Sequence, residues 1–148
     1  MKSRQLDIAS TLHSCLIKHV HACYWDSFSE KIWIFTGDAD GECKVIVADE
    51  NFTNLDVLGD GSQKWRAISA FFTNDAVYWM MDSPVDTSRL IKYIRKEDRI
   101  ETLQDFPGPI YYSVSFVDGG YLIATTYEPG PSVLGNTAVI FYSDDLEN

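Results

Sequence analysis

The sequence predicts an all-β fold, a partial β-propeller of about three four-stranded antiparallel sheets that are arranged radially as blades. The first observation behind this prediction is a repeat. An acidic residue closes the second strand of each set, at Asp38, Asp82 and Glu128, with intervals of 44 and 46 residues. Four strands in roughly 40 to 50 residues match the length of one propeller blade.

The second observation is a turn that recurs with a similar sequence interval. The turn after the third strand of each set recurs near Asp49, Lys96 and Asp144, with intervals of 47 and 48 residues. An ordinary β-sandwich with evenly spaced strands is the alternative. Two landmarks with one period, and no helical pattern between them, favour the propeller.

The repeat divides the chain into blades at residues 19–60 and 61–107 and an incomplete blade at 108–148, which is one strand short. Residues 1–18 show no decisive periodicity, and we assign them to an N-terminal segment that serves as the outer strand of a preceding blade. Runs rich in β-branched and aromatic residues predict the strands themselves. These are 20–25, 31–36, 43–48 and 55–58; 67–72, 76–81, 89–94 and 100–106; and 110–116, 121–126 and 138–142.

The clearest unit is the hairpin that opens the second blade. Ala67–Phe72 and Ala76–Met81 are apolar runs joined by Thr73-Asn74-Asp75, whose short polar side chains favour a tight turn. Antiparallel pairing brings the start of the first strand beside the end of the second. We therefore expect Arg66 to lie next to Asp82.

Size and composition indicate one packed globular domain that does not bind nucleic acid. The chain has 148 residues, 45% of them hydrophobic and 14% aromatic. Its formal net charge is −10, and its 12 Lys and Arg residues are scattered. A surface for nucleic-acid phosphates or for an anionic membrane needs clustered cations, so we expect neither partner.

Targeting signals and cysteines indicate a cytoplasmic protein. No apolar run approaches the roughly 20 residues of a membrane-spanning helix, and the polar residues that follow Met1 do not form a signal peptide. Cys15, Cys23 and Cys43 are odd in number and lack CxxC spacing. We expect reduced, buried thiols without a metal or redox role.

Two turns resemble the Asp-box, the Ser-x-Asp-x-Gly-x-Thr-Trp turn of the sialidase-like (BNR) β-propeller superfamily. They are residues 143–148, which follow an apolar strand, and a degenerate copy at residues 49–53; both lack the Gly. The chain from His19 onward is also similar to uncharacterised bacterial members of that superfamily. The similar segments are His-Val-His (19–21), Ile-Trp-Ile-Phe-Thr-Gly-Asp (32–38), Gly-Ser-Gln-Lys-Trp-Arg-Ala (61–67) and Tyr-Glu-Pro-Gly (127–130).

The resemblance implies the fold but does not carry over sialidase activity. Sialidases use three arginines and an Arg-Ile-Pro motif; this chain has no such motif, and Arg66 alone stands at the start of an inner strand. Propellers also contain 4 to 8 blades, and an open stack exposes strand edges. We therefore expect a fragment of a longer protein. The alternative is that copies self-associate through their open blade edges.

Polar residues are predicted to meet at one mouth of the central channel, because each inner strand starts where the second strand ends. A concave mouth with convergent polar groups is the default ligand site. The first blade contributes His19, His21, Asp38 and Asp40, the second Gln63, Arg66 and Asp82, and the third Tyr111, Tyr112 and Glu128. Since neighbouring side chains on a strand alternate, only one of the two tyrosines is expected to face the channel.

His19 and His21 are the predicted metal ligands. They share one face of a strand, and a His-x-His pair is a typical half-site for a divalent cation. The alternative is that each histidine hydrogen-bonds to a neighbouring carboxylate. A divalent cation is accordingly the one cofactor that the sequence suggests.

For the remaining residues we predict a glycan or acidic-sugar site. Arg66 is expected to hold a substrate carboxylate while Asp82 or Glu128 acts as general acid or base. Gln63, Asp38 and Tyr112 complete the predicted ligand-binding set. In the full-length protein such a site suits a glycoside hydrolase or lyase. The alternatives are a non-catalytic propeller scaffold, in which Arg66 and Asp82 form a structural ion pair, and a truncated remnant.

Overall fold

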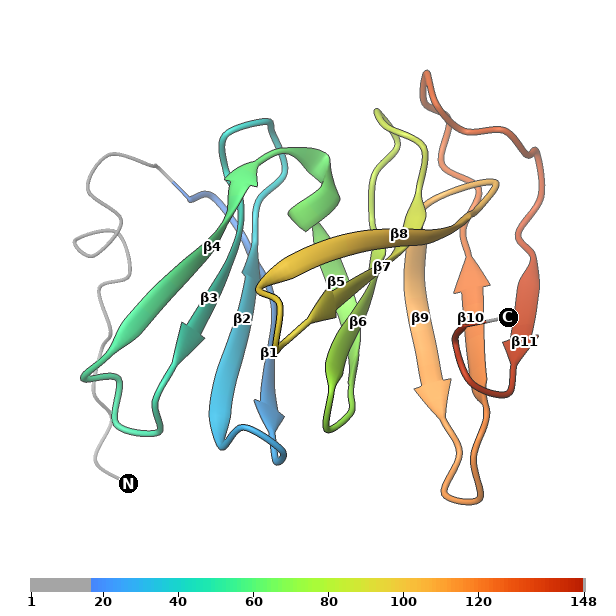
Figure 1. Ribbon diagram of the computed structural model, residues 1–148. Coiled ribbons are helices and arrows are strands. Elements are labelled where there is room, and N and C mark those ends of the chain that lie inside the picture. The colour runs from blue at the N-terminus through green and yellow to red at the C-terminus, as the bar shows by residue number, and fades with distance from the viewer. Residues whose placement is uncertain (1–16, 148) are drawn as a thin grey trace, which may run out of the picture.

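The structure, a computed structural model that describes residues 17–147, is an all-β partial propeller (Figure 1). Three antiparallel sheets follow one another along the chain, with four, four and three strands. In each sheet the strands pair in sequence order, which confirms the predicted fold class. The strands are β1 (Val20–Asp26), β2 (Lys31–Thr36), β3 (Cys43–Ala48) and β4 (Leu55–Gly61); β5 (Ala67–Phe72), β6 (Ala76–Met81), β7 (Arg89–Ile94) and β8 (Arg99–Asp105); and β9 (Ile110–Ser115), β10 (Tyr121–Thr125) and β11 (Ile140–Ser143).

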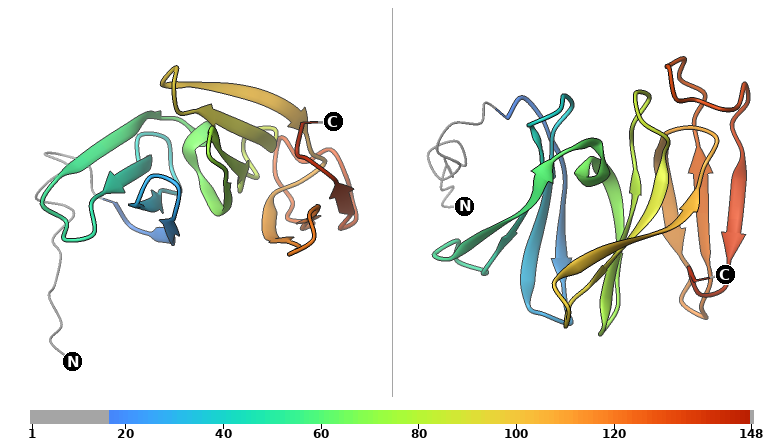
Figure 2. Two further views of the ribbon diagram at one scale, coloured as in Figure 1. Left: turned by 60° about the horizontal axis from the view of Figure 1, so that its bottom comes forward. Right: turned by 45° about the horizontal axis from the view of Figure 1, so that its top comes forward.

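The three sheets stand side by side around an arc. The first strands of consecutive sheets touch, since β1 lies against β5 and β5 lies against β9. Figure 2 (left) shows this inner row along one side of the arc and the outer strands β4 and β8 along the other. Contact between inner strands, with outer strands spread apart, is the arrangement of propeller blades rather than of a two-layer sandwich.

The predicted strands agree closely with the observed ones, and one short helix was not anticipated. The segment Gln63–Trp65 forms a single 3-10 turn between the first two sheets. Within the described residues, no helix has the length and apolar character needed to cross a lipid bilayer. The N-terminal segment assigned to residues 1–18 lies outside the described residues except for positions 17 and 18, which have no regular structure.

An aromatic core joins the first sheet to the second. Trp33 and Phe35 of β2 pack against Val77 and Trp79 of β6, and all four are buried. The rings of Phe35 and Trp79 lie 6.0 Å apart, and that of Trp65 lies 5.3 Å from Trp79. Trp33 and Trp79 therefore belong to the core between blades, and the partly buried Trp65 packs against it.

The opposite face of β6 packs against the third sheet. Ala76, Tyr78 and Met80 belong to a second buried cluster with Ile110 of β9 and Ile123 of β10. Side chains alternate along a strand, so a central strand between two sheets buries both faces. This explains why all six residues of β6 are buried.

The two turns that resemble the Asp-box are held by side-chain caps. The Asp49 carboxylate accepts hydrogen bonds from the backbone N–H of Thr53 (2.7 Å) and Asn54 (3.1 Å). The Ser143 hydroxyl accepts one from the N–H of Leu146 at 2.9 Å, and the Leu146 side chain is buried in the second core. Such caps fix a tight turn and involve no reactive group, so both turns are structural.

The cysteines require one correction. Cys43 is buried, and burial raises the pKa of its thiol to about 11. Cys23 is exposed, contrary to the expectation of buried thiols, because it stands on an alternating strand, β1, at a position that faces solvent. Both are free thiols; Cys15 lies outside the described residues.

Candidate functional site

One backbone hydrogen bond recurs at the same end of every blade. The residue that follows the second strand donates its N–H to the carbonyl of the residue that precedes the first strand. The repeat therefore places equivalent positions of all three blades at one end, where their side chains gather. The bonds are Gly37 to His19 at 3.2 Å, Asp82 to Arg66 at 3.0 Å and Thr126 to Pro109 at 2.8 Å.

A β-bulge accompanies this hydrogen bond in every blade. The register of the first strand slips by one residue, which leaves one extra residue opposite no partner on the second strand. The extra residue is His21 in the first blade, Ile68 in the second and Tyr111 in the third. Bulges redirect side chains, and here they turn His21 and Tyr111 toward the polar end.

Gly37 sets the position of Asp38. Its φ of +131° lies in the region that favours glycine, and a Cβ there would stand only 2.6 Å from the sulfur of Cys43. The chain can therefore pass close to Cys43 and carry Asp38 directly from the end of β2 to the histidines. No other residue type fits this turn without displacing Cys43.

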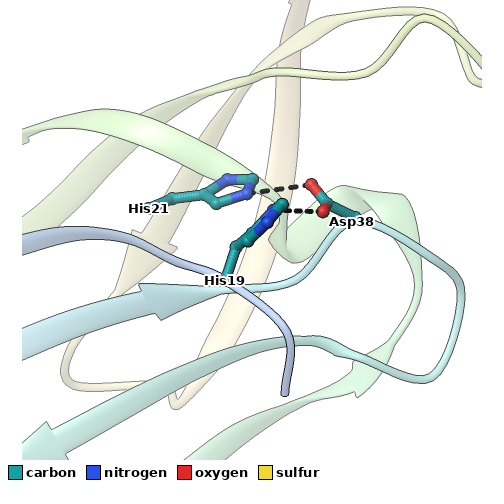
Figure 3. Close-up of side chains that lie close together, drawn as sticks. All are labelled: His19, His21 and Asp38. Atoms are coloured by element: carbon teal, nitrogen blue, oxygen red, sulfur yellow. Dashed lines mark hydrogen bonds and ion pairs between the residues drawn. The ribbon is translucent and has the colours of Figure 1, made fainter. Parts of the chain in front are cut away.

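Asp38 is the carboxylate on which three groups converge, the imidazole rings of His19 and His21, shown in Figure 3, and the guanidinium of Arg66. Its two oxygens contact His19 Nδ1 and, at 3.1 Å, His21 Nε2, and Arg66 Nη2 lies 3.5 Å away. Burial alone would raise the pKa of Asp38, but the hydrogen bond with His21 and the charge of Arg66 outweigh it and hold the pKa below its ordinary value. Asp38 therefore links the two blades electrostatically.

Asp82 is the more deeply buried carboxylate of the cluster. Its side chain is 5% exposed, and its Oδ2 lies 3.5 Å from Arg66 Nε and 3.8 Å from His21 Nδ1. Burial raises the pKa of Asp82 to about 6, and the charge of Glu128 adds to this, although Arg66 opposes both. Burial also lowers the pKa of His21. Removal from water thus outweighs pairing at both groups.

Three polar atoms at the centre of the cluster are buried and make no hydrogen bond among the described residues, although two of them lie within ion-pair distance of Asp82 Oδ2. Within residues 17–147, His21 Nδ1, Arg66 Nε and Asp82 Oδ1 have no hydrogen-bond partner. Buried polar atoms are normally satisfied, so each such atom calls for an explanation. These atoms belong to residues of two sheets and lie at or beside the Asp82 carboxylate. We therefore treat them as a single site.

Gln63 is fully used in holding the two blades together. Its amide Nε2 donates to the carbonyl of Asp38 at 3.0 Å and to Asp40 at 3.2 Å, and its Oε1 accepts from the Ser83 hydroxyl at 2.8 Å. The 3-10 turn that carries Gln63 positions it between the loops. Its predicted place in the cluster agrees with the geometry, but its contacts are those of a positioning residue.

The third blade adds Tyr111 and Glu128, whose side chains hydrogen-bond to each other. Burial, Glu128 and the charge of Asp82 all raise the pKa of Tyr111. The structure corrects the choice of Tyr112, which is 75% exposed and lies on the outer face of the sheet beside Ile140. The bulge at Tyr111 explains the difference, since it aims that ring toward the polar end.

The structure therefore brings together His19, His21, Asp38, Gln63, Arg66 and Asp82, with Glu128 close enough to act on Asp82 through its charge. Ser83 was not anticipated. Its hydroxyl accepts the backbone N–H of Asp86 at 3.1 Å while donating to Gln63. The signal in the sequence that could have identified Ser83 is the repeat, because it marks the end of β6 as a site position.

Comparison with protein-family models, with curated proteins and with solved structures found no significant match. The resemblance to sialidase-like propellers consequently stays a prediction from the residues quoted above. The function has to be argued from the cluster itself.

Proposed function

We propose that this chain is part of a sialidase-like β-propeller that binds a carbohydrate at the polar end of its blades. The observation that carries the proposal is the set of three buried atoms on His21, Arg66 and Asp82 that have no hydrogen-bond partner within residues 17–147. Leaving a polar group buried without a partner costs about 1–3 kcal/mol. A fold that keeps three of them together favours a ligand that supplies the missing partners.

A hydroxyl-rich ligand suits these atoms best. Asp82 Oδ1 requires a donor and Arg66 Nε an acceptor, and a hydroxyl group is both. The carboxylates of Asp38, Asp40, Asp82 and Glu128 also outnumber the single guanidinium of the cluster. This balance favours neutral sugar hydroxyls over an additional carboxylate, so we place neutral sugars ahead of acidic ones.

The ligand would approach from the side of His19 and Asp38, whose side chains are 64% and 32% exposed. Arg66 would turn from its two carboxylates toward the ligand, since its contacts with them are long, 3.5 Å each. Any proton transfer in a hydrolase- or lyase-like reaction would fall to Asp82 and Glu128. Glu128 is held for this role by Tyr111.

Binding can be tested on the chain as it is. We expect it to bind one or more neutral glycans on an array, and Asp82→Asn to weaken the affinity for the best of these at least about tenfold, measured by calorimetry. The matched control is Asp105→Asn, an exposed carboxylate paired with Arg89 on the outer part of the second sheet. Absence of binding on the array, or equal affinities of both variants, would overturn the proposal.

A non-catalytic scaffold is the second candidate, and one observation favours it. Arg66 contacts Asp38 from the first sheet and Asp82 from its own, so its guanidinium ties two blades together. In that case Arg66→Ala lowers the free energy of unfolding without changing any glycan affinity. The carbohydrate proposal expects both quantities to fall.

A further inference from the structure

We propose that His19, His21 and Asp38 bind a first-row transition-metal dication of the Zn²⁺ type. One ligand atom of each residue, Nδ1 or Nε2 of the histidines and a carboxylate oxygen, lies within 4.8 Å of the others. Figure 3 shows both imidazole rings directed at the carboxylate. An ion among them needs ligand distances of about 2.0–2.2 Å, so its binding requires the three side chains to rotate toward it.

Local backbone features place the three ligands before any ion arrives. The bulge at His21 turns its ring to the side of His19, and the two ring centres lie 6.2 Å apart. Gly37 brings Asp38 to the same point and donates its N–H to the His19 carbonyl. The ligands are thus supplied by the start of β1 and the end of β2, which pair with each other. A rigid strand pair is a good support for a metal site.

The second observation is the unpaired nitrogen of His21. Its Nε2 faces Asp38, while its Nδ1 has no hydrogen-bond partner among the described residues and lies 3.8 Å from Asp82 Oδ2. Both side chains are more than nine-tenths buried. A histidine that binds a metal through one nitrogen almost always donates its other N–H to a carboxylate or carbonyl. Asp82 stands where that partner is required.

The donor set and its surroundings select the class of cation. Two imidazoles and one carboxylate suit Zn²⁺ and its neighbours, whereas Mg²⁺ and Ca²⁺ prefer oxygen ligands throughout. Asp40 and Asp82 add negative charge that offsets Arg66. His19 is 64% exposed, so a fourth coordination position opens to solvent. Three protein ligands and one open position are typical of catalytic rather than structural zinc sites.

The metal itself is the probe in the test. Metal-free protein is titrated with Zn²⁺ by calorimetry, and with Co²⁺ by visible absorption, which reports the coordination geometry. We expect one ion per chain and tetrahedral Co²⁺ bands without a thiolate charge-transfer band. His19→Gln and Asp38→Asn should each reduce the affinity more than the roughly 10–100-fold loss expected for Asp82→Asn. Far-ultraviolet circular dichroism checks that each variant is folded.

Two controls separate this site from other ligands on the surface. Cys23→Ser removes an exposed thiol, and Asp105→Asn removes an exposed carboxylate on β8; both should leave the Zn²⁺ affinity unchanged. Zinc affinities of His19→Gln and Asp38→Asn equal to that of the unchanged protein would overturn the inference, as would Ca²⁺ binding as tight as Zn²⁺. Carbohydrate is absent from the titration, so failure of the glycan proposal leaves this result intact.

Discussion

The strands β6 and β10 hold the same place in their sheets and meet different surroundings. Both are the second strand of a blade, and both are nearly continuous apolar runs. All six residues of β6 are buried, because one sheet lies on each side of it. In β10 only Ile123 and Thr125 are buried, and Leu122 and Ala124, which alternate with them, line an apolar groove.

The difference shows that the neighbouring sheet, not the strand's own sequence, decides how much of a blade is buried. The outer face of the third sheet carries an apolar groove with a volume of about 250 Å³. Tyr112, Leu122 and Ile140 line it. Stability should therefore depend strongly on the residues between sheets and weakly on this outer face.

The largest expected effect is at the first interface. Trp79 is fully buried between the first two sheets, so we expect Trp79→Ala to lower the free energy of unfolding by about 3–5 kcal/mol. Tyr112→Ala removes another large ring, from the outer face of the third sheet, and should cost less than about 1 kcal/mol. Urea denaturation measures both. Similar losses in the two variants would show that the outer face is covered in solution.

The next effect concerns an ion pair that joins the first two blades. Arg95 Nη1 lies 2.7 Å from Asp26 Oδ2, and Asp26 is fully buried. Arg95→Leu leaves this carboxylate without its cation and should cost about 3 kcal/mol, because an unpaired buried charge is unfavourable. The matched variant is Lys92→Leu, whose partly exposed pair with Glu147 joins the second and third sheets.

Partly exposed pairs contribute about 0–1 kcal/mol, so Lys92→Leu should have little effect on the urea midpoint. Equal effects of the two variants would mean that Asp26 is satisfied without Arg95. The N–H of Phe28 and the hydroxyl of Ser29 already donate to Asp26. Asp26→Asn, tested with Arg95→Leu in a double-mutant cycle, then measures how much of the loss comes from the pair itself.

A smaller contrast lies within β10. Ile123 faces the second sheet and is 3% exposed, whereas Leu122, its neighbour, lines the outer groove. We expect Ile123→Ala to cost about 2 kcal/mol or more and Leu122→Ala about 1 kcal/mol or less, because only the first leaves a cavity. Thermal unfolding of the two variants side by side gives the comparison. A reversed order would contradict the packing of the third sheet on the second.

The fold could be predicted from the sequence because the repeat consists of residues whose local structural preferences are well known. Acidic residues at strand ends and polar turns recur at nearly the same sequence interval. The apolar runs between them are short enough to be strands. Trp33 and Trp79 lie within two of these runs and are buried between the first two sheets, since rings of that size need burial. Cys23 was wrongly predicted to be buried, because alternation alone does not tell which face of an inner strand is covered.

The candidate site was only partly accessible, and the reason is the bulges. Strict alternation treats Tyr111 and Tyr112 as equivalent choices, but an extra residue in the register sends Tyr111 to the polar end. The same irregularity directs His21 to Asp38 and Asp82. Bulges depend on the pairing of two strands, so no pattern within one strand reveals them. The nearness of Arg66 to Asp82 was predictable because it needed only an ordinary hairpin.

The smallest expected effect is a pH dependence at the second interface. Lys92 and Tyr78 both hydrogen-bond to Glu147, and these bonds, Lys92 first, hold the pKa of Glu147 below its ordinary value of 4.5. A lowered folded-state pKa contributes stability that is present above pH 4.5 and is lost as the pH falls through the lowered value. The side chain is 37% exposed, so solvent screening keeps this contribution below about 1 kcal/mol.

Glu147→Gln should therefore reduce the free energy of unfolding slightly at neutral pH and not at all once the pH is well below the lowered pKa. Urea titrations of the variant and the unchanged protein across the acid range measure this difference. Glu101→Gln is the control, because the partner of Glu101, Arg99, lies on the same strand and bridges no interface. A difference between Glu147→Gln and the unchanged protein that persists at low pH would assign the effect to packing of the C-terminal turn rather than to charge. The ionic contact would then add nothing to the apolar one made there by Leu146.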